Sequence, residues 1–264
     1  MKILATSPYR LKTLAVRQSL LVLVRSGEKR MVSPRLTLRC RPAQALLLAQ
    51  GTQWEVVNDP AGSLRYEALC IAFDDEVLAR AAQTFELQHL KQVQSAELLA
   101  ADDGELQEAI DRLDTERFGA RVSPRLQAHR ALELLLLLAE RGWYFEHDKA
   151  LAWSDRVRRL VAQRPDADWN VPRIAAAFHI SPSSLRRRLE GEALTAAAIV
   201  REVRLETALC LLQGGCHSIG EVAQRCGWES HSRFTAAFHQ RWGVLPSVVR
   251  ANVHENGESL VANG

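Results

Sequence analysis

The sequence predicts an α+β protein with a β-rich N-terminal domain, a helical segment after it and an all-α C-terminal domain. Up to residue 73, short apolar runs alternate with turn residues, which is typical of strands in a small sandwich or barrel. Beyond residue 73 the apolar residues follow the helical period instead. Near the C-terminus, two segments have the pattern of a helix, a tight turn and a second helix, and one long helix joins them. A length of 264 residues accommodates two domains with cores of their own.

The predicted strands are short and end at turn signals. They cover residues 19–24, 30–32, 36–38, 45–49, 55–57 and 66–73. The polar runs 25–29 and 58–62 contain glycine and are expected to be turns. Strands of this length, with a turn about every ten residues, favour a closed or two-sheet antiparallel structure.

Three helices are expected between the strands and the C-terminal domain. Asp74 and Asp75 can cap a helix over 76–85, and Asp102 and Asp103 a helix over 105–117. Pro124 opens a third helix, over 125–141, which Gly142 ends. A polar cluster at 140–141 and 147–148 contains no nucleophile beside a base, so it is interpreted as a solvated helix end and loop.

The third of these helices is rich in leucine. Leu132, Leu135, Leu136 and Ala139 form one stripe, and the leucines at 134, 137 and 138 extend the apolar surface nearly all round. Such a helix must be covered on more than one side. It either packs inside its own domain or pairs with the same helix of a second subunit, and the second interpretation predicts a homodimer.

The C-terminal half begins with a predicted helix from Ser154 to Arg164, for which Ser154 is the expected cap. Asn170 begins a second helix with Pro172 in its first turn, and the Ser181-Pro182 pair begins a third over 183–190. The last two make the first helix-turn-helix unit. Residues 156–250 contain fourteen arginines, no lysine and eight acidic residues, a net charge of +6 that favours a polyanionic partner.

A long helix over 195–213 follows, and the second helix-turn-helix unit comes after it. Ile219, Val222 and Ala223 mark one face of a short helix that Gly227 ends. The next helix is capped by Ser230, with Phe234 and Phe238 four residues apart and able to pack inward together. By periodicity alone, a plain helical hairpin explains these residues equally well.

The second unit resembles the C-terminal signature of AraC/XylS-type transcription regulators. The matching positions are Ile219, Val222-Ala223, Cys226-Gly227-Trp228, Ser230, Ser232, Phe234, Phe238, Trp242-Gly243 and Pro246. The chain departs from the family at Arg233, where an aromatic residue is usual, and at Val249, where a tyrosine is common. In the first unit it departs at Leu189, where phenylalanine is usual, and at Ala193, near an expected glycine. The resemblance covers residues 155 to 250, and the strand layout is similar to the cupin-type sensor barrel of many members.

This resemblance implies a division into four parts. They are a cupin-like sensor or partner-binding β-barrel (1–95), a helical dimerisation segment (96–150), a DNA-binding domain (151–254) and a flexible tail (255–264). In the first unit, the base-reading positions of the family fall on Ser183, Arg186 and Arg187, with Ser184 and Arg188 nearer the phosphates. In the second unit they fall on His231, Ser232 and Arg233. Arginine donates two parallel hydrogen bonds to guanine, which favours Arg186, Arg187 and Arg233 as readers. A plain solvated face is the alternative for 186–188.

The resemblance further implies a cytoplasmic transcription regulator, most often an activator, with a double-stranded DNA operator and RNA polymerase as partners. Its N-terminal domain is expected to bind either a small molecule or a protein. An apolar ligand with an acidic head group suits the apolar strands and their few basic residues, Lys12, Lys29 and Arg65.

Enzyme function is not expected, and neither are catalytic residues, a metal or a cofactor. The alternative of a cupin-type enzyme fused to a DNA-binding domain is disfavoured because cupin metal sites use histidines and none occurs before His89. Five cysteines without a two-residue spacing are interpreted as free thiols, not as a metal cluster around Cys216 and Cys226. The N-terminus has no signal-peptide pattern, and the longest apolar run, 134–139, is too short to cross a membrane.

Overall fold

The structure is a computed structural model, and it describes residues 1–101, 104–118, 123–147, 152–215 and 217–250. The chain forms two compact units, Met1–Asp148 and Lys149–Gly264. The predicted tail at 255–264 lies outside the described residues, as do the expected cap at 102–103 and Cys216.

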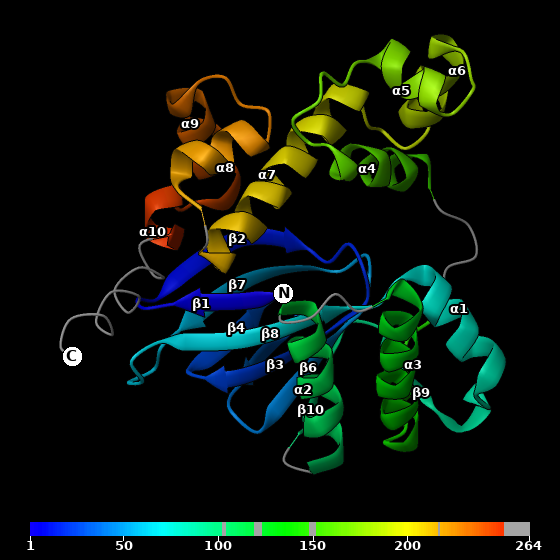
Figure 1. Ribbon diagram of the computed structural model, residues 1–264, viewed down its shortest axis with the longest axis vertical. Helices are drawn as coiled ribbons and strands as arrows, with labels where there is room; N and C mark the ends of the chain where they lie inside the picture. The colour runs from blue at the N-terminus through cyan, green and yellow to red at the C-terminus, as the bar shows by residue number, and fades with distance from the viewer. Residues whose placement is uncertain (102–103, 119–122, 148–151, 216, 251–264) are drawn as a thin grey trace. The chain divides into compact units, whose positions relative to one another are not determined.

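The N-terminal unit contains two antiparallel sheets (Figure 1). The first has the order β1-β8-β3-β6-β10, formed by Lys2–Ala5, Tyr66–Ala72, Leu20–Ser26, Gln44–Leu48 and Ala96–Ala100. The second has the order β2-β7-β4-β5, formed by Tyr9–Ala15, Gln53–Asp59, Glu28–Val32 and Thr37–Cys40. A short parallel pair, β9 (Lys91–Gln92) with β11 (Trp143–Tyr144), completes the β structure of the described residues.

Each predicted strand overlaps an observed one, but five observed strands were not expected. These are β1, β2 and β10 and the two-residue strands β9 and β11. In β2, buried Tyr9 and Leu11 alternate with exposed Arg10 and Lys12, so a period-two signal was present. The turn expected at 25–29 is also shorter, because β3 and β4 leave only Gly27 between them. Gly27 has a φ of +79°, and a Cβ there would lie 2.4 Å from the Asp59 carbonyl oxygen, so only glycine fits.

The first sheet is covered on both faces. Leu21 and Leu23 of β3 pack in one core with the helices of this unit. Val22 and Val24 are equally buried. Successive strand residues point to opposite faces, so these two valines face the second sheet.

Three α-helices cover the outer face of the first sheet: α1 (Asp75–Thr84), α2 (Gly104–Phe118) and α3 (Pro124–Glu140); a 3₁₀ turn, η1 (Leu87–His89), follows α1. Ser123 caps α3 by accepting from the backbone N–H of Leu126, and Pro124 lies in its first turn. The leucines at 134, 135, 137 and 138 are buried in the core of their own unit. These side chains are therefore not available for a subunit contact, and the exposed leucines of α3 are Leu136, 42% exposed, and Leu126, 40% exposed.

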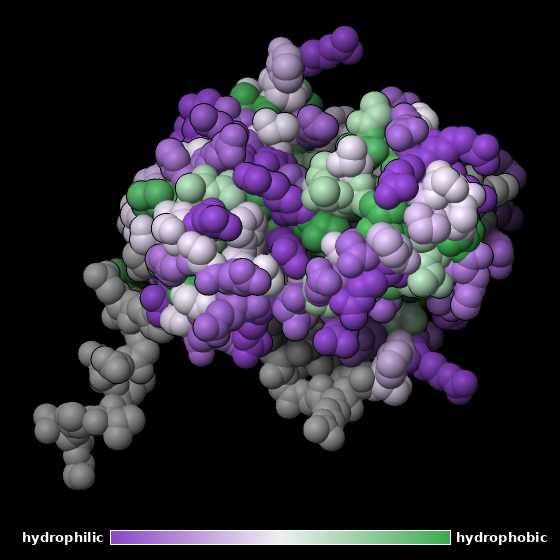
Figure 2. Space-filling view, turned by 90° about the horizontal axis from the view of Figure 1, so that it is seen from above, coloured by the Kyte–Doolittle hydropathy of each residue, from purple (hydrophilic) through white to green (hydrophobic). Residues whose placement is uncertain are grey.

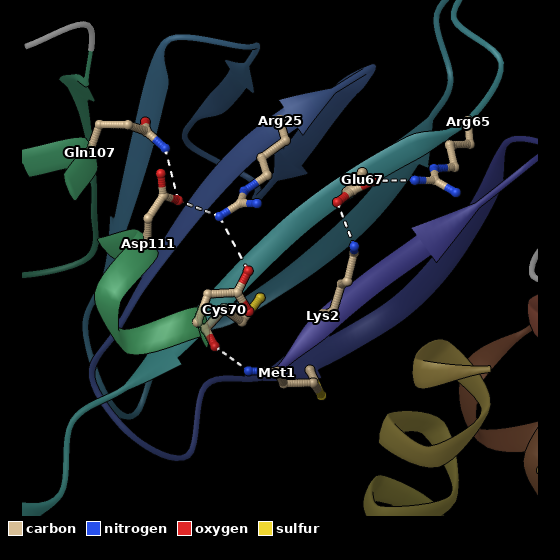
Figure 3. A network of polar contacts seen from close by, with 9 residues as sticks. Met1, Lys2, Arg25, Arg65, Glu67, Cys70, Gln107 and Asp111 are labelled. Carbon is tan, nitrogen blue, oxygen red and sulfur yellow. Dashed lines mark hydrogen bonds and ion pairs between the residues drawn. The ribbon is translucent and has the colours of Figure 1, made fainter. Parts of the chain in front are cut away.

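Ion pairs and hydrogen bonds connect α2 and the N-terminal residues to the first sheet (Figure 3). Arg25 of β3 contacts Asp111 of α2 at 2.5 Å, and Gln107 donates to the same carboxylate. On β8, Glu67 accepts from Lys2 at 2.7 Å and from Arg65 at 2.8 Å. The helical segment predicted at 96–150 thus shares contacts and a core with the strands that precede it.

The C-terminal unit consists of seven helices in its described residues. They are α4 (Trp153–Gln163), α5 (Val171–Ala177), α6 (Pro182–Glu190), α7 (Ala196–Gly214), α8 (Ile219–Arg225), α9 (His231–Trp242) and α10 (Pro246–Arg250). Within this unit α7 runs as a rod, with α4–α6 towards one end and α8–α10 towards the other (Figure 1). Among the described residues, no helix has the length and apolar character needed to cross a membrane.

The first helix of this unit begins differently from the prediction. Its N-cap is Ala152, and Ser154 lies within its first turn. The backbone N–H groups of Trp153 and Ser154 donate to the carboxylate of Glu192, at 2.7 and 3.0 Å. A cap supplied from 39 residues away leaves no local signal in the sequence.

Candidate nucleic-acid interface

The first helix-turn-helix unit is made by α5 and α6. Asn170 caps α5, and Ser181 caps α6 by accepting from the backbone N–H of Ser184 at 3.1 Å. Leu185 and Leu189 of α6 are buried, which fixes the helix on its neighbours. The opposite face is exposed to solvent and carries Ser183, Arg186 and Arg187, at relative positions i, i+3 and i+4.

The second unit is made by α8 and α9. Ser218 and Glu221 form a capping box at the start of α8, and Ser230 caps α9. Hydrogen bonds from Ser218 lower the pKa of Glu221, so this carboxylate stays ionised at the helix N-terminus. The predicted reading positions His231, Ser232 and Arg233 are consecutive and exposed in the first turn of α9.

A row of aromatic rings holds α9 in place. Trp228, Phe234, Phe238 and Trp242 follow one another with ring centroids 5.9, 5.7 and 6.4 Å apart. Phe234 and Phe238 are fully buried, as their four-residue spacing predicts. The buried face therefore sets which face of α9 is left to solvent.

The rod α7 is tied to both units. Arg204 donates to the carbonyl oxygens of Pro165 at 2.9 Å and Ala167 at 3.0 Å, in the segment before α5. The Arg204 guanidinium also lies against Gly227, and a Cβ added at residue 227 would come within 2.8 Å of this guanidinium. Glu202 accepts hydrogen bonds from Arg241 of α9, the shortest at 2.6 Å. Contacts on both sides of one helix fix how the two helix-turn-helix units are oriented to each other.

All the predicted reading residues lie in the first two turns of α6 or in the first turn of α9. The structure brings Ser183, Arg186 and Arg187 together, and His231, Ser232 and Arg233 together, as two separate groups. Arg188 is exposed too, but its guanidinium lies 4.1 Å from the centre of the Trp153 ring. The face seen in Figure 2 is mainly hydrophilic, with hydrophobic residues in small groups.

A second group of polar residues lies across the four-stranded sheet of the N-terminal unit. Strand register places Tyr9 beside Asn58, Asn58 beside Lys29, and Lys29 beside Cys40. Lys29, only 3% exposed, donates to Asn58 Oδ1 at 2.8 Å, and Asn58 donates to the Tyr9 hydroxyl at 2.8 Å. We call these four residues the polar row. Of the basic residues expected inside, only Lys29 is there: Lys12 is exposed, and Arg65 pairs with Glu67.

Burial shifts the pKa values of ionisable groups in and beside the polar row. Burial lowers the pKa of Lys29, although the Cys70 and Cys40 thiols act in the other direction. Burial also raises the pKa of Cys40 to about 12 and that of Tyr66 well above its usual value. Tyr66 faces the row from β8, with Lys29 Nζ 5.8 Å from its ring centre, and its hydroxyl has no hydrogen-bond partner in the part of the chain that the structure describes. An ammonium has three donors, and among the described residues Lys29 donates one hydrogen bond.

Comparison with known proteins agrees with this architecture. A family described as "Helix-turn-helix domain" matches residues 174–252. The urease operon transcriptional activator of Escherichia coli is 28% identical over 105 residues, covering 40% of this chain and 36% of the relative. The activator FapR of Escherichia coli is 32% identical over 107 residues, covering 40% and 41%. The alignments thus span less than half the length of these curated relatives.

Solved structures extend the similarity of fold to nearly the whole chain. Apo ToxT from Vibrio cholerae matches with a TM-score of 0.65 at 11% identity, covering 96% of this chain and 97% of ToxT. The structure of ToxT bound to an unsaturated fatty acid matches with a TM-score of 0.57 at 11% identity, covering 96% and 95%. Both the β-rich unit and the helical unit therefore have a counterpart in one known fold. With two helix-turn-helix units on one rod, the C-terminal unit is thus similar to the helix-turn-helix domains of these transcriptional activators, and the chain as a whole shares its fold with ToxT.

Proposed function

We propose that this protein is a sequence-specific DNA-binding transcription regulator that acts as an activator. The observation that carries the proposal is the pair of serine-capped helices, α6 and α9, which present exposed arginine and small polar side chains from two ends of one rod. Two such helices suit adjacent major-groove segments about one turn, or 10 base pairs, apart. The curated relatives that match the C-terminal unit include proteins named as transcriptional activators.

In this proposal the two helices divide the reading of the operator. Arg186, Arg187 and Arg233 donate to guanine, and Ser183, His231 and Ser232 contact neighbouring base edges. Ser184 and Arg188 contact phosphates. The net charge of +6 over residues 156–250 supports binding to a polyanion in any sequence.

Genome-wide footprinting followed by a titration tests this proposal. A duplex with the recovered sequence and a scrambled duplex of equal length are titrated with the full chain at physiological salt. A specific regulator prefers the first by about a thousandfold or more. Equal affinity for the two duplexes contradicts sequence-specific recognition.

We further propose that an acidic, largely apolar molecule controls the protein through the polar row. A carboxylate would accept from Lys29 and from the Tyr66 hydroxyl, which would supply partners for both buried groups. The apolar side chains between the two sheets would contact its tail. That ToxT, the neighbour in fold, has been solved with an unsaturated fatty acid supports this class of ligand.

Thermal shift of the full chain with a panel of fatty acids and other organic acids tests effector binding. The Lys29→Met variant should lose a shift that the wild-type protein and the exposed control Lys12→Met retain. If no acid shifts the wild-type protein while a protein partner is recovered through its N-terminal unit, control by a partner protein replaces this proposal.

Two partners complete the proposal, and the resemblance to AraC/XylS-type regulators implies both. They are a second copy of the chain, which would place two pairs of reading helices on the operator, and RNA polymerase, which an activator recruits. The exposed Leu126 and Leu136 of α3, the predicted dimerisation helix, are available for contact with the second copy.

A further inference from the structure

Two arginines from different helices share one aromatic ring in the C-terminal unit. The guanidinium of Arg156, in the first turn of α4, lies 5.0 Å from the centre of the Trp153 ring, and that of Arg188, from α6, lies 4.1 Å from it. Both arginines are exposed. A guanidinium within about 6 Å of an indole centre is attracted by the ring quadrupole.

Most other arginines of this unit form an ion pair or donate hydrogen bonds within the protein. Arg241 pairs with Glu202 at 2.6 Å, Arg158 approaches Glu206 at 3.8 Å, and Arg173 approaches Asp168 at 3.7 Å. Within the part of the chain that the structure describes, Arg156 and Arg188 contact no carboxylate. Each guanidinium instead lies against the Trp153 ring, which leaves both positive charges available to an anion.

The surface where they lie adjoins the proposed reading face. Arg188 follows Arg187 directly and lies four residues after Ser184, so it shares a side of α6 with Ser184 and flanks the reading side. The first turn of α4 lies against this flank, since Trp153 contacts Arg188. In helix-turn-helix proteins, the flanks of the reading helix contact the sugar-phosphate backbone.

We infer that Trp153 is a positioning residue that holds Arg156 and Arg188 side by side for the DNA backbone, and that Arg156 is a phosphate contact in its own right. The inference rests on the proposed DNA-binding function. Two long side chains that are already ordered lose less conformational freedom when they bind, so the same charges give tighter binding. Glu192 contributes indirectly, because its hydrogen bond to the Trp153 backbone fixes the turn that carries the ring.

Titration of a duplex of arbitrary sequence, from about 50 to 300 mM salt, separates charge from positioning. Arg156→Ala and Arg188→Ala should each reduce the magnitude of the salt slope by about one, as expected for a lost phosphate contact. Arg173→Ala is the matched control, since Asp168 already compensates its charge, and should change the slope little. An unchanged slope in Arg156→Ala overturns the assignment of Arg156.

Variants at Trp153 test the positioning role. Trp153→Leu keeps every charge, so it should weaken binding about three- to tenfold with nearly the same salt slope. Trp153→Phe keeps an aromatic face and the packing against Phe178, whose ring centroid is 5.5 Å away, and should recover most of the affinity. In a chain that already carries Arg156→Ala and Arg188→Ala, Trp153→Leu should have no further effect.

An equal loss from Trp153→Leu in both backgrounds would overturn the positioning role, because it would show a purely structural effect. If Trp153→Leu does not fold, the Trp153→Phe variant and the two salt slopes decide the question. Failure of the wild-type chain to bind any duplex contradicts the proposed function itself. Normal wild-type binding with unaffected Trp153 and Arg156 variants overturns this inference alone.

Discussion

The carboxylate of Glu192 accepts a 2.7 Å hydrogen bond from the backbone N–H of Trp153, 39 residues earlier in the chain. The loop after α6 thereby caps α4, the first helix of the C-terminal unit. Burial by itself raises the pKa of Glu192, but hydrogen bonds from Ser154 and Trp153 outweigh it, so the pKa lies below its ordinary value of 4.5. The cap is therefore a charged one at neutral pH.

Removing this cap should destabilise the C-terminal unit. Glu192→Ala leaves two N–H groups of α4 without their acceptor and should cost about 1 kcal/mol at pH 7. Because the folded-state pKa is depressed, the contribution is complete above pH 4.5 and is lost as the pH falls through the folded-state pKa. Urea unfolding of Glu192→Ala and of the exposed control Glu190→Ala, from pH 7 to pH 3, measures this. A gap between the two variants that does not narrow with falling pH contradicts the charged cap.

Arg186 and Arg233 should carry specificity rather than general affinity. Alanine at either position should cost about 1 to 3 kcal/mol on the operator and relax the preference in its own half-site. Binding to scrambled DNA should change much less. Arg225→Ala, an exposed arginine on α8, provides the control. Unchanged discrimination between operator and scrambled duplex would mean that these two residues do not read bases.

Lys29 should make stability depend on alkaline pH. Since burial depresses its pKa below the ordinary 10.5, the folded state binds fewer protons than the unfolded state between these two values. The free energy of unfolding of the wild-type protein should therefore rise relative to that of Lys29→Met as the pH increases from 7 to 10. Lys12→Met, at an exposed position, should show no such trend relative to the wild type. A difference independent of pH would show that the ammonium is not desolvated.

Substitutions of two leucines of α3 should distinguish a role in folding from a role in subunit association. Leu138 is 1% exposed in the core, and Leu138→Ala should cost about 2 to 5 kcal/mol. Leu136 is 42% exposed, so Leu136→Arg should leave the unfolding midpoint nearly unchanged. If α3 pairs between subunits, Leu136→Arg should also yield a monomer in sedimentation. A folded, still dimeric Leu136→Arg would place the subunit contact elsewhere.

Replacement of Ala193 by glycine should stabilise the C-terminal unit. Ala193 has a φ of +55°, in the left-handed region where a Cβ costs about 1 to 2 kcal/mol, and it lies near the position where the family resemblance expects a glycine. Ala193→Gly should raise the thermal midpoint of the C-terminal unit. The same substitution in a regular helix, Ala236→Gly in α9, should instead lower stability by about 1 kcal/mol. Equal losses from both would contradict strain at Ala193.

The C-terminal helices were largely predictable because their signals are local. Asn170, Ser181, Thr195, Ser218 and Ser230 all cap the helices that follow them. The four-residue spacing of Phe234 and Phe238 correctly predicts their burial. Strands β1, β2 and β10 were not predicted, and all three lie at sheet edges, where the alternation contains fewer apolar residues. Strands β9 and β11 were not predicted either, because two residues are too few to show a pattern.

The sequence by itself determined the two helix-turn-helix units and the faces of α6 and α9, because caps and apolar spacing act within a few residues. Only the tertiary structure decided which leucines of α3 are buried, since a helix apolar nearly all round has no preferred inner face in its own pattern. It also decided that Lys29 lies inside while Lys12 and Arg65 do not, because strand register fixes the face of every side chain. The Glu192 cap and the Trp153 contacts with Arg188 join residues 35 or more positions apart, so no local pattern could specify them.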